Sequence, residues 1–106
     1  MKIEKKNKAS ISNYTEEEST NINIPDNEIL MGVAGELDSN LKELEKLTGA
    51  EIYFRGNSIT IKGRKALIKD VKDAIHYLID RFKSNKKISK NDIISSLNKD
   101  MLDDIK

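Results

Sequence analysis

The middle of the chain contains two kinds of apolar periodicity. Residues 20–24, 50–54 and 58–62 place apolar side chains at every second position, the spacing of a strand that buries one face. From Leu67 to Phe82, apolar side chains recur every three or four residues, which is typical of an amphipathic helix. We therefore expect three short strands and one long helix that covers the sheet.

Two shorter helices are expected between the first and second strands. Asp26 is placed to cap a helix of about two turns that ends near Gly35. A second helix is expected from Ser39 to Thr48, with Gly49 as its C-terminal stop. Its apolar stripe consists of Leu41, Leu44 and Leu47. The pair Gly56-Asn57 predicts a tight hairpin between the second and third strands.

The two ends of the chain differ from this central part. Residues 1–19 are polar, lack a sustained apolar period and predict a disordered tail. Residues 20–83 form the expected domain, with Pro25 ending the first strand. Residues 84–106 are expected to be a linker plus a C-terminal helix, which Ser89 and Asp92 would start as a capping box.

Composition excludes several classes of function. The chain has no cysteine and a single histidine, so no thiolate or histidine-rich metal site is expected, and no nucleophile–base pair can be assembled. We expect no catalytic residue, metal or cofactor in this chain. Its 19 basic and 18 acidic residues give a net charge of +1, so any nucleic-acid contact must be local. Neither a membrane-spanning segment nor a signal peptide is evident, which predicts a soluble intracellular protein without a membrane partner.

The expected order of elements resembles a type-I KH domain. Four short stretches carry the resemblance: Ile24-Pro25, the turn Gly35-Glu36-Leu37-Asp38, Leu41-Lys42-Glu43-Leu44, and Thr48-Gly49-Ala50-Glu51-Ile52. They are similar to the Val-Pro, GXXG, Ile-Lys-x-Ile and Thr-Gly-Ala-x-Ile pattern of KH domains. The resemblance implies an α+β fold of order β-α-α-β-β-α, with a three-stranded sheet covered by helices on one face and an extra C-terminal helix.

A narrower resemblance is to the N-terminal KH-like domain of PhoH-like (phosphate starvation-inducible) P-loop ATPases. The stretches that carry it are Asp38–Glu45, Ala50–Ile52, Arg55–Asn57 and Ile59–Gly63. It implies a single-stranded-RNA-binding accessory module in a bacterial cytoplasm. The partners it implies are the protein's own ATPase domain and RNA-processing proteins. None of the five glycines begins G-x-x-x-x-G-K-[ST], so ATP and Mg would belong to a domain absent from this chain, which reads as a non-enzymatic fragment.

The glycine turn is the first candidate RNA contact. Gly35, Glu36, Leu37 and Asp38 occupy the GXXG positions, where two glycines would let the backbone approach phosphates. Each carboxylate within about 5 Å of a phosphate opposes binding by roughly 1 kcal/mol at a dielectric near 80. Weak RNA binding is therefore expected. Asp38 also has a structural explanation, because it could cap the helix from Ser39.

Basic and aromatic residues complete the candidate set. We expect the groove and the hairpin rim to carry Lys42, Arg55, Lys62, Arg64 and Lys65, although any one of these can equally be a solvated surface charge. Tyr53 should lie on the opposite sheet face, where it could stack on a base or pack across strands.

A KH-shaped protein-docking module is the alternative function. It would bind the ATPase domain or its oligomer, and the acidic turn and near-zero net charge favour it. A basic channel beside Gly35–Asp38 would favour RNA, whereas an exposed apolar patch there would favour a protein partner.

Overall fold

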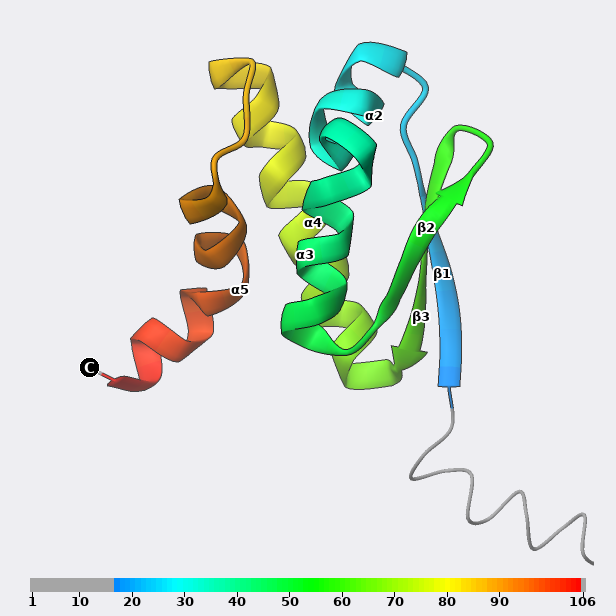
Figure 1. Cartoon of the computed structure of the whole chain (residues 1–106). Coiled ribbons are helices and arrows are strands. Elements are labelled where there is room, and N and C mark those ends of the chain that lie inside the picture. Colours follow the sequence, from blue (N-terminus) through cyan, green and yellow to red (C-terminus); the bar gives the residue numbers. More distant parts are fainter. Residues whose placement is uncertain (1–16, 106) are drawn as a thin grey trace, which may run out of the picture.

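A three-stranded antiparallel sheet forms one layer of the molecule. The computed structural model of the chain describes residues 17–105, so residues 1–16 of the expected tail lie outside it. The strands are β1 (Glu17–Asn23), β2 (Glu51–Arg55) and β3 (Ser58–Arg64), in the spatial order β1-β3-β2. The fold is α+β, as expected, and the helices lie on one face of the sheet (Figure 1).

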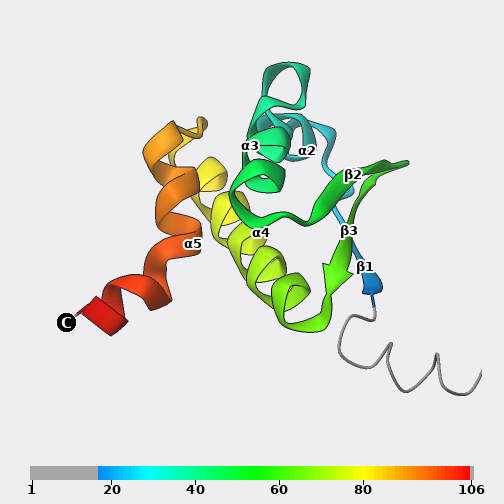
Figure 2. The same ribbon diagram turned by 60° about the horizontal axis from the view of Figure 1, so that its bottom comes forward.

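The helices follow the expected order. They are α2 (Asn27–Ala34), the short 3₁₀ turn η1 (Glu36–Asp38), α3 (Ser39–Thr48), α4 (Lys65–Asn85) and α5 (Lys90–Ile105). Helix α4 packs against β1 and β3, and α3 packs against β2. The last helix, α5, packs against α4 and α3 (Figure 2).

The core lies between the sheet and the helices. Fully buried apolar side chains come from α2, α3, β3 and α4: Val33, Leu41, Leu44, Ile59, Ile61, Val71, Ile75 and Leu78. On β3, Ile59 and Ile61 both point into this core. Because side chains alternate along a strand, the residues between them belong to the other face. We call this helix-free surface the open face of the sheet.

Most local signals in the sequence are confirmed. Asp26 accepts hydrogen bonds from the backbone N–H groups of Glu28 (2.9 Å) and Ile29 (3.3 Å) and so caps α2. Gly49 ends α3 at φ 84°, and its N–H donates to the Glu45 carbonyl. Ser89 and Asp92 form the expected capping box through reciprocal hydrogen bonds of 3.1 and 2.8 Å.

A strand boundary and a side-chain exposure differ from the sequence expectations. β1 begins at Glu17, because β3 continues to Arg64 and pairs with Glu17, so residues 17–19 are strand rather than tail. Leu47 is 48% exposed, because the stripe of α3 that faces the core contains only Leu41 and Leu44.

Within residues 17–105, no helix is long and apolar enough to cross a membrane.

Candidate nucleic-acid interface

The glycine turn joins α2 to α3 through unusual backbone angles. Gly35 adopts φ 82° and ψ 170°, a region essentially restricted to glycine. Leu37 (φ 54°) and Asp38 (φ 61°) then follow in the left-handed region, which costs a residue with a Cβ about 1 kcal/mol or more. Two consecutive non-glycine residues are thus held in a strained loop at the start of α3.

Asn40 holds this turn in place. Its side-chain Nδ2 donates to the carbonyl of Val33 at 3.1 Å, so the first turn of α3 is tied to the last turn of α2. A Cβ on Gly35 would come within 2.7 Å of the same Nδ2. Gly35 is therefore required for its conformation and also for the space beside Asn40. Sequence reasoning missed Asn40, although an amide side chain in the first turn of a helix is a known source of local side chain–backbone bonds.

The expected cap on α3 is wrong. Asp38 occupies the N-cap position, but its side chain makes no capping hydrogen bond. Capping residues normally have extended backbone angles that let the side chain reach the second or third N–H of the helix, whereas Asp38 has φ 61° and ψ 25°. No side chain caps the start of α3. The 3₁₀ turn already accepts the N–H groups of Asp38 and Ser39 at the Gly35 and Glu36 carbonyls, so an anion could meet only the N–H groups that follow.

The hairpin tip lies at the same end of the molecule as the turn. Only Gly49 and Ala50 separate α3 from β2, so the two elements run antiparallel, and Glu45 Oε2 accepts a hydrogen bond from Ile52 N at 2.8 Å between them. At about 1.5 Å per helical and 3.3 Å per strand residue, α3 and β2 are both about 15–17 Å long. The start of α3 and the end of β2 at Arg55 therefore lie towards the same end of the molecule (Figure 1).

Lys42 and Arg55 are the basic candidates at this end. Lys42 is exposed one turn into α3, four residues after Asp38 and three before Glu45, so it shares their face of the helix. Arg55 is exposed beside Gly56, whose φ of 67° makes the hairpin turn. Glu36 and Asp38 offset these two positive charges. The side chain at the tip of the turn is Leu37, which is 85% exposed.

The remaining candidates lie elsewhere. Tyr53 is 37% exposed and lies on the open face, directly across from Thr60. Lys62 shares that face two residues further along β3. The structure therefore separates Tyr53 and Lys62 from the turn by the thickness of the sheet.

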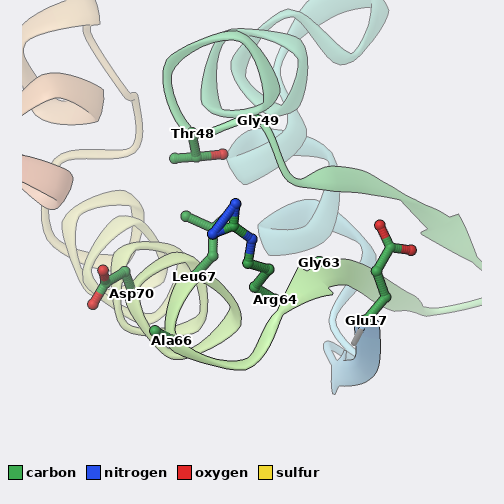
Figure 3. Close-up of a pocket in the computed structure, with 8 residues that line it drawn as sticks. All are labelled: Glu17, Thr48, Gly49, Gly63, Arg64, Ala66, Leu67 and Asp70. Carbon is green, nitrogen blue, oxygen red and sulfur yellow. The ribbon is translucent and has the colours of Figure 1, made fainter. Parts of the chain in front are cut away.

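Arg64 and Lys65 are at the opposite end of β3 from the hairpin, about 20 Å away for a strand of this length. The expectation that they border the hairpin rim is wrong, because β3 runs straight from Ser58 to Arg64. Arg64 instead extends into a hollow of about 480 Å³ between the end of α3 and the start of α4 (Figure 3). The residues that line this hollow are Glu17, Thr48, Gly49, Gly63, Arg64, Ala66, Leu67 and Asp70.

Within the described part of the chain, no group of three or more histidine or acidic side chains could hold a metal ion. Comparison with protein-family models, curated proteins and solved structures found no match. The candidate site therefore consists of the turn, the start of α3 and the hairpin tip.

Proposed function

We propose that this chain is a type-I KH-like module that binds single-stranded RNA weakly at the end of the molecule formed by the Gly35–Asp38 turn and the hairpin. The element order β-α-α-β-β-α and the strand order β1-β3-β2 support the KH-like topology. The resemblance to PhoH-like proteins supports a role as the RNA-binding accessory domain of a P-loop ATPase.

The observation that carries the proposal is the start of α3, which no side chain caps, at the same end of the molecule as two exposed cations. Phosphates bind readily at a helix N-terminus, and here Lys42 and Arg55 lie at the same end of the molecule. By analogy with KH domains, the bound strand would be about four nucleotides long. Glu36 and Asp38 would weaken the binding without removing the backbone contacts.

Titration with short single-stranded RNA, followed through backbone amide shifts at low and high salt, tests this proposal. We expect salt-sensitive shifts from Gly35 to Leu44 and near Arg55. Asp38→Asn, which removes a negative charge and keeps a residue that tolerates the left-handed region, should strengthen binding by roughly fivefold at low salt. Absence of shifts at millimolar RNA would refute RNA binding by this chain.

A protein-docking function is the second candidate, and the exposure of Leu37 favours it. An apolar side chain 85% exposed at the tip of an acidic turn could insert into a pocket of a partner protein. In that case a PhoH-like ATPase domain, and not RNA, should shift the Leu37 amide. Leu37→Ala should then abolish the shift.

A further inference from the structure

The two edges of the sheet are protected differently. On the outer edge of β2, the Ile52 N–H donates to Glu45 Oε2 of α3. No segment within residues 17–105 pairs with the outer edge of β1. The outward-facing N–H and C=O groups of an edge strand can pair with another extended chain.

β1 lacks the usual features that block such pairing. Edge strands are commonly protected by lysine, proline, a bulge or very short length. β1 has seven residues, Glu-Glu-Ser-Thr-Asn-Ile-Asn, and its register with β3 is continuous. Its only charges are Glu17 and Glu18 at its start. The edge from Ser19 to Asn23 is therefore open to an added strand.

A row of lysines follows one side of α4. Its members are Lys65, Lys69, Lys72 and Lys83, and all four are exposed. They lie four, seven and eighteen residues after Lys65, close to whole numbers of 3.6-residue turns, so they share one face of the helix. We call this set the lysine stripe.

The lysine stripe lies on the flank of α4 nearest β1. The opposite flank carries Arg81, whose Nε lies 3.3 Å from Asp92 Oδ1 of α5. The buried Ile68 and Ile75 border the stripe on the side of the sheet. Because α4 packs against β1 whereas α3 packs against β2, the side of α4 away from α3 and α5 lies towards the β1 edge near the start of the helix. The end of α4 diverges from β1 and packs against α2 (Figure 1).

We propose that the open β1 edge and the lysine stripe together bind an extended acidic peptide by strand addition. The peptide backbone would pair with Ser19–Asn23, and carboxylates at alternate positions on the helix side would meet the lysines. Lys65, Lys69 and Lys72 span about 11 Å at the start of α4, less than the roughly 23 Å of β1, so they would meet carboxylates along only part of the added strand.

Charge disfavours two other occupants, and the need for an amide backbone disfavours a third. A second copy that paired β1 with β1 about a two-fold axis would bring two lysine stripes onto the same face of one continuous sheet, where they repel each other. Residues 1–16 contain four lysines and two glutamates, so their net charge has the same sign as the stripe. RNA could contact the lysines but has no amide backbone to pair with the strand edge.

In the free protein, Lys69 can leave its acidic partner at little cost in free energy. Lys69 Nζ lies 3.4 Å from Asp73 Oδ2, and both side chains are mostly exposed. Such exposed pairs contribute little to stability, so a peptide carboxylate can replace Asp73.

The test uses the full chain, isotope-labelled, and an N-acetylated octapeptide of alternating Glu and Thr. We expect amide shifts at Ser19–Asn23 and Lys69–Lys72. The same peptide with N-methyl groups on every second backbone nitrogen keeps its charge but cannot complete the strand pairing, and it should bind at least tenfold more weakly. This comparison needs no protein variant, so it does not depend on a variant folding.

Charge reversal tests the stripe separately. Lys69→Glu with Lys72→Glu should weaken binding roughly tenfold at low salt. The matched control, Lys46→Glu with Lys87→Glu, changes the net charge equally at exposed sites on α3 and after α4 and should leave affinity within twofold.

Four results would overturn the proposal. They are equal binding of the N-methylated peptide, equal losses in the two double variants, a dimer that protects the β1 amides without peptide, and tighter binding of oligouridine to the same residues. These results are independent of RNA binding at the turn, which involves other amides.

Discussion

Gly35 is the residue on which the geometry of the turn depends most. Its backbone angles are nearly inaccessible to other residues, and the space beside it is occupied by the Asn40 amide. Gly35→Ala should lower the free energy of unfolding by about 2–3 kcal/mol, measured by urea denaturation. Gly49→Ala is the control, since Gly49 also has a positive φ (84°) but has open space around its Cβ position. It should cost only about 1 kcal/mol. Equal costs would show that the Asn40 contact does not matter.

Leu37 allows the strain in the turn to be measured. It adopts φ 54° with its side chain in solvent, so little packing is lost when it is replaced. Leu37→Gly should leave stability unchanged or raise it by up to about 1 kcal/mol, because relief of left-handed strain offsets the entropy of glycine. Leu47→Gly, at another exposed leucine within a regular helix, should lower stability by about 1 kcal/mol. A comparable loss at both positions would argue against strain at Leu37.

At the level of elements, one carboxylate forms a hydrogen bond between α3 and β2. Glu45 Oε2 accepts the Ile52 N–H at a partly buried position. Glu45→Ala should lower stability by about 1–2 kcal/mol and speed hydrogen exchange of the Ile52 amide. Glu45→Gln keeps an acceptor and should retain most of the protection. If Ile52 exchanged equally in both variants, the bond would not be what holds this edge.

The docking of α5 should depend on pH through Asp92. The backbone N–H of Ser89 donates to this carboxylate, and together with the Ser89 hydroxyl and the nearby Arg81 it holds the pKa of Asp92 below its usual value of 3.8, against the opposing effect of burial. Because the folded pKa is the lower one, this stabilisation is complete above about pH 4 and is lost as the pH falls through the folded pKa.

Protection of the α5 amides against hydrogen exchange, measured between pH 6 and pH 3, should therefore decline on acidification. Asp92→Asn should flatten the decline. Asp70→Asn, eleven residues from Arg81 on α4, should leave it unchanged. A decline that persists in Asp92→Asn would assign the pH dependence to another group.

At the level of the whole molecule, the sequence predicted the elements better than the placement of the candidate site. Apolar patterns of period two and period 3.6 identified all three strands and the helices, because each pattern is formed by residues close together in the sequence. The absence of a capping bond from Asp38 could not be predicted in this way. Whether an aspartate caps a helix depends on its backbone angles, and here the Asn40–Val33 bond and the tight α2–α3 connection determine them.

The separation of the basic residues in space could not be predicted from local sequence patterns either. Arg55 and Arg64 lie nine positions apart, yet the hairpin puts them at opposite ends of the sheet. The side-chain period of β3 likewise places Lys62 on the open face. Lys65 joins the lysine stripe of α4, a surface that becomes visible only once α4 is placed beside β1.

RNA binding at the turn is tested most directly by the affinity of short single-stranded RNA for two matched variants, Arg55→Ala and Arg64→Ala. Both remove one arginine charge, but only Arg55 lies at the end that carries the Gly35–Asp38 turn. If RNA binds there, Arg55→Ala should weaken binding about fivefold to tenfold and reduce its salt dependence by about one charge, whereas Arg64→Ala should have little effect. Equal effects, or a larger loss in Arg64→Ala, would contradict RNA binding at the turn.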